Sequence, residues 1–264
     1  MGEEDFGLTV VLYGPSGCGK STIARRLEKC GFTRIMQLTT REPGYIQGSQ
    51  PGVIMDERKM GEYAFVSYNH FMKLFDKGMF AEMMSFDKIQ NGTQDEVFYG
   101  SLTYEYLEPG YHVVTTNIEG AAQLACESAI EESPLHGRLI FVEISVPIGP
   151  RLLKACDRER DNLDEVFRRA VNEKRLYYTA SKWDIFPQDY FPDMILHDDE
   201  FPPSVEEFLF GRWTKEMKED RWSYTRCYWY TDAKPEDVSR TIDGAAEDIL
   251  EYISNRIGSE GSEV

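Results

Sequence analysis

Residues 14–21 read Gly14-Pro15-Ser16-Gly17-Cys18-Gly19-Lys20-Ser21 and match the phosphate-binding loop pattern Gly-x-x-x-x-Gly-Lys-[Ser/Thr] at every fixed position. An apolar, β-branched run at 8–13 precedes the loop and predicts a buried strand. The run at 21–30 has the apolar spacing of a helix, which is expected to end at Gly31. Strand, loop and helix thus follow one another in the order that a nucleoside triphosphate site requires.

The residue types of the loop suit this chemistry. Its glycines let backbone N–H groups turn inward, and these groups bind phosphate oxygens together with the N-terminus of the following helix. Lys20 is expected to reach the terminal phosphates, and the Ser21 hydroxyl is expected to ligate Mg²⁺. Cys18 is expected to be a small filler rather than a nucleophile. The predicted triphosphate-binding residues of this segment are Gly14, Ser16, Gly17, Cys18, Gly19, Lys20, Ser21 and Thr22.

The composition narrows the classes of partner. The chain has 264 residues and a formal net charge of −17, which argues against nucleic acid as a partner because phosphate neutralisation needs surplus Lys and Arg. The cysteines are scattered, with no Cys-x-x-Cys pair, and fit reduced thiols. No apolar run approaches the roughly 18 residues that span a membrane, and the start of the chain lacks a signal sequence. We expect a cytoplasmic protein with no membrane partner and no zinc.

Strands and helices are expected to alternate along most of the chain. Further strands are predicted at 33–36, 63–67, 80–86, 111–116, 138–144 and 193–199. Helices are predicted at Phe71–Phe75, 102–108, 119–132, 163–178 and 235–257, and loops at 44–62 and 87–96. This alternation predicts an α/β fold of three layers, in which helices cover both faces of a parallel sheet.

Four features have two interpretations on the residues alone. Arg41, between a threonine and a turn proline, suits a phosphate but is also a common loop residue. Glu82 lies in a predicted apolar strand. It is either a functional carboxylate or an edge-strand residue that faces water. Arg158 and Arg169 belong to a cation-rich segment that either binds phosphate or pairs with neighbouring acids. The aromatic-rich stretch 200–235 is either a docking surface or a small satellite core, and the latter is favoured.

Taken together, these pieces resemble the guanylate kinase family of nucleoside monophosphate kinases. The matching blocks cover about residues 8–200 in family order: Gly14 to Ser21, Thr39-Thr40-Arg41-x-Pro43, Tyr63-x-Phe65-Val66-Ser67, Gly78-x-Phe80-x-Glu82, Tyr99-Gly100-Ser101, Gly120, Arg158 with Arg169, and Asp193-x-Ile195-Leu196-x-x-Asp199. The resemblance implies a P-loop NTPase fold with a core at 1–36, 107–149 and 170–264. It also implies a monophosphate-binding subdomain at 37–106 and a short lid at 150–169.

The resemblance implies transfer of the ATP γ-phosphoryl group to a nucleoside 5′-monophosphate, with Mg²⁺, by a monomer or a homodimer. Lys20, Arg158 and Arg169 would be the catalytic residues, and Asp198 would lie near the ATP base. Within the acceptor site, Arg41, Tyr63 and Tyr99 would grip the phosphate, whereas Glu82 and Ser101 would hydrogen-bond the base. The implied acceptor-binding residues are Gln37, Arg41, Tyr63, Glu82, Tyr99, Ser101 and Asn117.

Four sites depart from the family pattern. Gly44 replaces a second phosphate-binding arginine, and Gln37 replaces a serine that helps to read guanine. Thr115-Thr116-Asn117 replaces an Asp-x-Asp strand end, and Asp198 replaces an asparagine that the family often has near the ATP base. Most of the altered residues belong to the set that would recognise the base. GMP or dGMP is the default acceptor because Glu82 is kept, and a modified or non-guanine deoxynucleotide is the alternative because Gln37 and Asn117 differ. A base-free ribose phosphate and a non-catalytic binding module also remain open. Intact Lys20 and Ser21 favour an enzyme.

Overall fold

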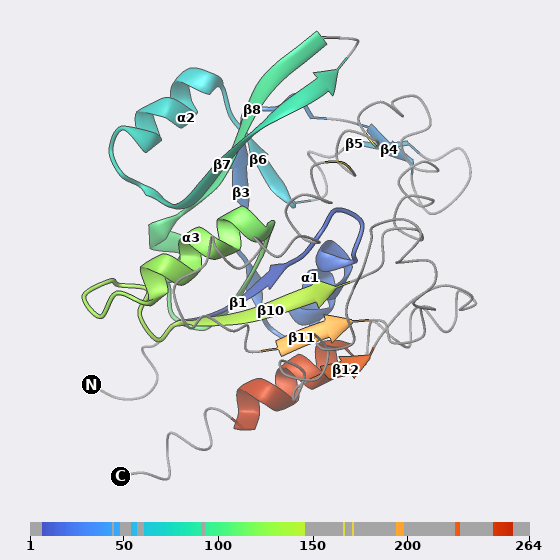
Figure 1. The fold of residues 1–264 in the computed structure, drawn as a ribbon, viewed down its shortest axis with the longest axis vertical. Helices are drawn as coiled ribbons and strands as arrows, with labels where there is room; N and C mark the ends of the chain where they lie inside the picture. Colours follow the sequence, from blue (N-terminus) through green and yellow to red (C-terminus); the bar gives the residue numbers. More distant parts are fainter. Residues whose placement is uncertain are drawn as a thin grey trace.

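The computed structural model describes residues 7–43, 45–47, 54–56, 61–90, 93–145, 166, 171, 194–197, 225–227 and 245–255. A six-stranded sheet occupies the lower half of Figure 1, with strand order β12-β11-β10-β1-β9-β2 and parallel pairing throughout. Its strands are β1 (Leu8–Tyr13), β2 (Thr33–Arg34), β9 (Tyr111–Thr116), β10 (Leu139–Ser145), β11 (Met194–His197) and β12 (Thr225–Cys227). The predicted parallel α/β sheet is thus confirmed.

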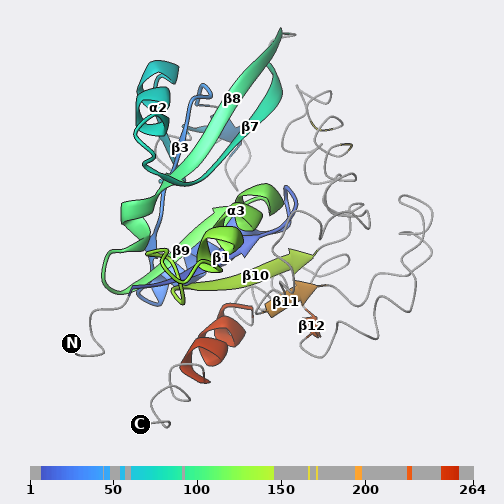
Figure 2. The same cartoon turned by 60° about the vertical axis from the view of Figure 1, so that its left-hand side comes forward.

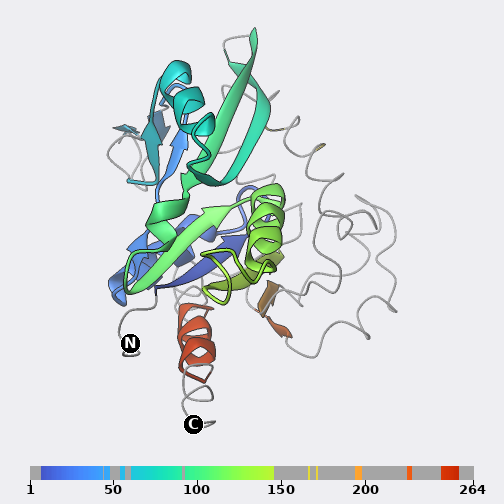
Figure 3. The same cartoon turned by 90° about the vertical axis from the view of Figure 1, so that its left-hand side faces the viewer.

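The side chains of this sheet alternate between two apolar faces. On β1, Val10 and Leu12 pack into one cluster with α1 (Lys20–Lys29) and with the helical residues 245–255. Val11 and Tyr13 pack into another cluster with α3 (Ile118–Ser128). Strands buried on both faces read as continuous apolar runs, which is why 8–13 shows no alternation of polar residues. Helices therefore cover both faces, as the three-layer prediction required, and the opposed layers are seen in Figure 3.

A four-stranded sheet lies above the first, with strand order β6-β3-β8-β7 (Figure 1). Its strands are β3 (Gln37–Thr39), β6 (Tyr63–Phe65), β7 (Phe80–Gln90) and β8 (Thr93–Leu102). Helix α2 (Tyr68–Phe75) begins at Ser67, whose hydroxyl accepts a hydrogen bond from the His70 N–H, as an N-cap should. It packs its buried Phe71 on Phe80, with ring centroids 4.5 Å apart. The 3₁₀ helix η3 (Thr103–Tyr106) leads back to the core.

Helix α3 joins the two sheets. The Gln123 side chain donates to the Met83 carbonyl at 2.7 Å and accepts from the Met83 N–H at 2.9 Å, so α3 is docked on β7. In Figure 2 the β7–β8 ribbon extends upward from the level of α3, and α2 lies beside this ribbon in the upper part of the molecule. Helix α3, which covers one face of the core sheet, is thus also in contact with the four-stranded sheet.

Several predicted elements differ from the observed ones. The predicted loop 87–96 is wrong, because β7 continues to Gln90 and β8 begins at Thr93, so the two strands form one long antiparallel ribbon. The predicted loop 44–62 contains a small antiparallel pair, β4 (Tyr45–Gln47) with β5 (Ile54–Asp56). Both pairs are held by backbone hydrogen bonds between strands. The residue types of a polar segment do not predict such bonds. Helix α3 ends at Ser128 rather than at Glu132.

The lid prediction falls almost entirely outside the described residues. Within it and the helix predicted after it, only Val166 and Val171 are described, and both are helical. Of the aromatic-rich stretch 200–235, only β12 is described. Among the described residues, no helix combines the length and the apolarity needed to cross a bilayer.

Candidate functional site

The phosphate loop is a tight turn between β1 and α1. Gly17 and Gly19 adopt φ angles of 77° and 97°, a left-handed backbone that favours glycine. A Cβ on Gly14 would meet the Ile144 carbonyl oxygen and would lie 2.9 Å from the Cys18 sulfur. Cys18 is fully buried under the loop, which agrees with the prediction that it fills space. Gly19 is the N-cap of α1 and has no side chain, so the first N–H groups of α1 have no side-chain cap and suit an anion.

Lys20 and Ser21 are the first two residues of α1, so both side chains start at the loop. The Lys20 Nζ donates to the carbonyls of Gly14 at 2.7 Å and Pro15 at 2.9 Å, which places the ammonium over the loop. The Ser21 hydroxyl donates to Glu62 Oε2 at 3.2 Å, and its oxygen keeps lone pairs for a metal. No group of three or more His, Cys, Asp or Glu within the described residues could hold a metal ion. The Ser21 hydroxyl oxygen is of the ligand type that Mg²⁺ takes together with phosphate oxygens and water.

Three of the predicted acceptor residues lie together on the upper sheet. Strand β3 pairs with β6 on one side and with β8 on the other, and this register places Thr39 beside both Phe65 and Tyr99. The rings of Tyr63 and Tyr99 meet edge to face, with centroids 5.7 Å apart. The guanidinium carbon of Arg41 lies 5.0 Å from the centroid of the Tyr63 ring. A guanidinium and two phenols brought together in this way can bind a phosphate group.

A buried polar cluster surrounds Glu82, where β3, β7, β8 and β9 meet. Glu82 is 1% exposed, and its Oε1 accepts from Gln37 Nε2 and from the Ser101 hydroxyl, both at 2.8 Å. Gln37 Nε2 also lies 3.5 Å from Thr116 Oγ1, and the Ser101 and Tyr106 hydroxyls are 2.6 Å apart. Among the described residues, no group within hydrogen-bonding geometry pairs with the buried Glu82 Oε2, although the nearby Thr116 hydroxyl helps to lower the pKa of the carboxyl. An unpaired carboxylate oxygen of this kind is costly unless a ligand satisfies it.

Burial governs the titration of this cluster. Loss of hydration raises the pKa of Glu82 above its usual value, although the hydrogen bonds from Gln37 and Ser101 oppose that rise. The pKa of Tyr106 is raised well above its usual value, chiefly by burial and also by the nearby negative charge of Glu82. The phenol of Tyr106 therefore stays protonated, and it is held against Ser101.

Gly120 lets α3 approach the unpaired oxygen. Asn117 caps α3, because its Oδ1 accepts from the Gly120 N–H at 2.9 Å. A Cβ on Gly120 would meet Thr116 Oγ1 and would lie 2.6 Å from both Glu82 Oε2 and Met84 Cε. The N-terminus of α3 thus lies against the carboxylate, where its partial positive charge is favourable.

Substitution of Gly120 by alanine is expected to disturb this cluster. The added methyl group would have to displace the Thr116 hydroxyl and the ends of the Glu82 and Met84 side chains, and overpacking of this kind costs roughly 1–3 kcal/mol. The melting temperature should fall by several degrees, at roughly 2–4 °C per kcal/mol. Thermal unfolding measures this, with Cys126→Ala, exposed on the same helix, as the control. An unchanged melting temperature for Gly120→Ala would show that α3 does not approach Glu82 this closely.

Other predicted residues are either placed elsewhere or not described. Arg158, Arg169 and Asp198 lie outside the described residues. Asn117 caps α3, and its amide nitrogen lies 3.4 Å from Glu119 Oε2. Gln37 donates to Glu82 itself, an interaction that the prediction of a direct contact with the base did not include.

Sequence reasoning missed Tyr106 and Glu62. Tyr106 completes the cluster around Glu82 together with Thr116, which was expected only as part of the altered strand end, and Glu62 bonds the loop serine. Only the position of Glu62, one residue before the Tyr63 block, could have drawn attention to it.

The chain is similar in sequence to known guanylate kinases. No model of a protein family matches the chain. The guanylate kinase of Nitratidesulfovibrio vulgaris is 31% identical over 194 residues, which cover 70% of this chain and 80% of that protein. The guanylate kinase of Oleidesulfovibrio alaskensis is 33% identical over 173 residues, 64% of this chain and 73% of that protein. The crystal structure of guanylate kinase from Anaplasma phagocytophilum aligns over 98% of this chain and 89% of its own, with 15% identity and a TM-score of 0.43. The extent of the likeness to the two curated proteins shows that this chain belongs to the guanylate kinase family.

Proposed function

We propose that the chain is an ATP- and Mg²⁺-dependent nucleoside monophosphate kinase whose default acceptor is GMP or dGMP. One observation carries the proposal: the buried Glu82 carboxylate has one oxygen that pairs with none of the described residues, on the same sheet as the Arg41–Tyr63–Tyr99 group. A hydrogen-bond acceptor for a base and a cationic, phenolic group for a phosphate are the two halves of a nucleotide site. The phosphate loop, which belongs to the adjoining sheet, supplies the second nucleotide site that phosphoryl transfer requires.

We propose that the two sheets bind different substrates, the four-stranded sheet the acceptor and the six-stranded sheet ATP. Residues 37–106 would form the monophosphate-binding subdomain, 150–169 the lid, and the rest of the chain the core. Phosphoryl transfer depends mainly on in-line positioning and charge stabilisation, so Lys20, Arg158 and Arg169 would act as cations around the transferring group. Mg²⁺, when bound at Ser21, would neutralise charge on the triphosphate. Exclusion of water by the lid would protect ATP from hydrolysis.

The base preference follows from which oxygen of Glu82 is available. Because Gln37 and Ser101 both donate to Oε1, the remaining acceptor is Oε2, which is buried against Gly120 of α3 and would have to be uncovered before a base could reach it. Guanine presents N1–H and an amino group on its Watson–Crick edge, and either can donate to a carboxylate oxygen. Adenine presents an unprotonated N1 there, which would repel it. Bases that keep the N1–H donor, including modified guanines, therefore remain candidates.

A coupled assay of ADP release over a panel of acceptors tests the proposal. We expect turnover of GMP or dGMP, at least tenfold weaker turnover of AMP and CMP, and none with ribose 5-phosphate or ribose 1,5-bisphosphate. Turnover of a ribose phosphate in preference to every nucleotide would assign Glu82 a role other than base reading. If ATP binds but no acceptor is phosphorylated, the chain is a binding module and the proposed activity is wrong.

A further inference from the structure

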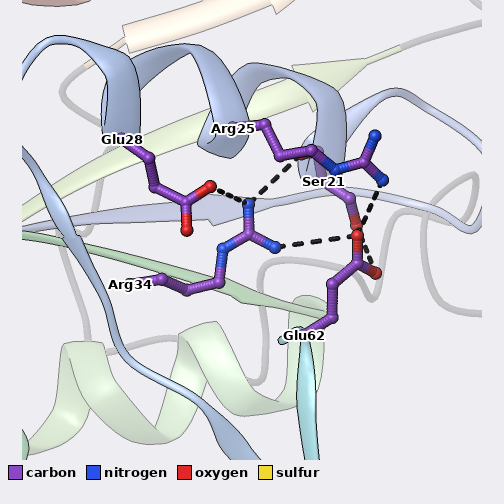
Figure 4. Close-up of polar contacts among 5 residues, drawn as sticks. All are labelled: Ser21, Arg25, Glu28, Arg34 and Glu62. Carbon is purple, nitrogen blue, oxygen red and sulfur yellow. Dashed lines mark hydrogen bonds and ion pairs between the residues drawn. The ribbon is translucent and has the colours of Figure 1, made fainter. Parts of the chain in front are cut away.

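Glu62 connects β6, an edge strand of the four-stranded sheet, to the residue that follows Lys20 in the phosphate loop (Figure 4). It immediately precedes β6, and its Oε2 accepts a hydrogen bond from the Ser21 hydroxyl at 3.2 Å. Its Oε1 pairs with Arg25 Nη2 at 2.8 Å and lies 3.7 Å from Arg34 Nη1. One carboxylate thus contacts the metal-ligand candidate with one oxygen and two guanidinium groups with the other.

The two arginines fix the orientation of this carboxylate. The Arg34 side chain is 6% exposed, and its Nη2 bonds Glu28 at 2.9 Å and lies 3.4 Å from the Ser21 carbonyl oxygen. Arg34 is therefore held from two sides, and its remaining terminal nitrogen faces Glu62 (Figure 4). The Glu62 side chain is itself only 17% exposed, so its contacts are less screened than those of a surface pair.

We propose that Glu62 is a positioning residue that orients the Ser21 hydroxyl for the Mg²⁺ ion accompanying the nucleoside triphosphate. A hydroxyl has one hydrogen and two lone pairs. When Glu62 accepts the hydrogen bond from the Ser21 hydroxyl, the lone pairs of Ser21 Oγ point away from the carboxylate and remain available to a metal. An anionic acceptor also increases the electron density on that oxygen, as acidic partners do for other metal ligands. The inference rests on the proposed function insofar as Ser21 is the metal ligand.

Glu62→Gln tests the inference because it keeps the shape of the side chain and removes its charge. The measurement is the dissociation constant of ATP, by calorimetry without acceptor, in Mg²⁺ and in EDTA. In the wild type, ATP should bind more tightly in Mg²⁺ than in EDTA. We call the ratio of the ATP dissociation constant in EDTA to that in Mg²⁺ the gain from Mg²⁺. In Glu62→Gln this gain should be smaller by roughly tenfold or more, the usual loss when a partner of a metal ligand is removed. The affinity in EDTA should stay unchanged.

A matched control lies in the same cluster. Glu28→Gln makes the same chemical change and removes a partner of Arg34, but Glu28 does not bond the Ser21 hydroxyl. It should leave the gain from Mg²⁺ within about twofold of the wild type. An equal loss in Glu28→Gln and Glu62→Gln would mean that the total charge of the cluster matters, and not the charge of the group that accepts from Ser21, and would overturn the proposal.

A double substitution separates positioning from general stability. In a Ser21→Ala background, Glu62→Gln should cause no further loss of the gain from Mg²⁺, because the hydroxyl that it orients is absent. Additive losses would overturn the proposal. Glu62→Asp, which keeps the charge but shortens the reach to Ser21, provides a second variant if Glu62→Gln does not fold, and it should show the same loss.

Two outcomes concern the wild type alone. A wild type that binds ATP equally well in Mg²⁺ and in EDTA overturns the role of Glu62, since no metal contribution remains for it to tune. A wild type that binds no ATP under either condition instead contradicts the proposed function. The failures of the two proposals are thus distinguishable.

Discussion

Lys20→Ala is expected to lower kcat/KM for ATP by at least about 10²–10³-fold, the usual loss when one preorganised group that stabilises transition-state charge is removed. The Lys20 ammonium lies over the loop, 2.7 Å from the Gly14 carbonyl oxygen, so it needs only a short movement to meet an incoming phosphate. Steady-state kinetics with saturating acceptor measures the loss. The melting temperature should change by only a few degrees, because Lys20 is not part of the core.

Lys29→Ala is the matched control for this substitution. It removes the same side chain from the last turn of the same helix, at an exposed position, and should leave kcat/KM within about twofold. A Lys20→Ala protein that retains more than a tenth of wild-type activity would contradict a catalytic role for the phosphate loop.

Glu82→Gln is expected to weaken function and increase stability at the same time. The carbonyl of the introduced glutamine could still accept from Gln37 and Ser101, while its NH₂ group would replace the unpaired Oε2. A donor would then face the N1–H donor of guanine, so kcat/KM for GMP should fall by about 10–100-fold, which corresponds to roughly 1–3 kcal/mol. Removal of a buried, unpaired carboxylate oxygen should raise the melting temperature by several degrees at neutral pH.

The stability gain of Glu82→Gln should depend on pH. Burial raises the pKa of Glu82 above its ordinary value of 4.5, so the folded protein binds this proton more tightly than the unfolded chain does. The stabilising contribution of the proton is fully present below pH 4.5 and is lost as the pH rises through the folded-state pKa. The difference in melting temperature between Glu82→Gln and the wild type should therefore be small near pH 4.5 and widen toward about pH 8.

Thermal unfolding of both proteins across this pH range provides the test. Burial also raises the pKa of Glu105 to about 6, but Glu105 is present in both proteins and its contribution cancels in the difference. A difference that does not change with pH would mean that Glu82 loses no proton in this range. A lower melting temperature for Glu82→Gln at the alkaline end of the range would mean that Oε2 has a partner in the folded protein.

The sequence was most informative where structure is decided locally. Strand β1 was predicted at its observed residues, and α1 within one residue, because a β-branched run, a glycine loop and Gly31 are adjacent signals. Gly31 has a φ angle of 98°, the left-handed conformation that ends many helices. In contrast, the β7–β8 ribbon was missed between 87 and 96, where the residues are polar and the strands are held by pairing between distant partners.

The residue types of the candidate site were easier to predict than its contacts. The resemblance brought Arg41, Tyr63 and Tyr99 into one group, and the register of β3 with β6 and β8 places them together. Their role in binding phosphate stays a prediction. The bond from Gln37 to Glu82 spans 45 residues, and the bond from Ser21 to Glu62 spans 41. Partners this far apart in sequence are chosen by the fold, so a single sequence does not identify them.

The pairing of Gln123 with Met83 also affects the exposed edge of the four-stranded sheet. Strand β7 is the outer strand of its sheet, and the edge of such a strand is a template on which another chain can add a strand of its own. At Met83 the outward N–H and C=O are both taken by the Gln123 amide, which offers the same donor and acceptor as a neighbouring backbone. Helix α3 therefore closes this stretch of the edge against aggregation with a single side chain.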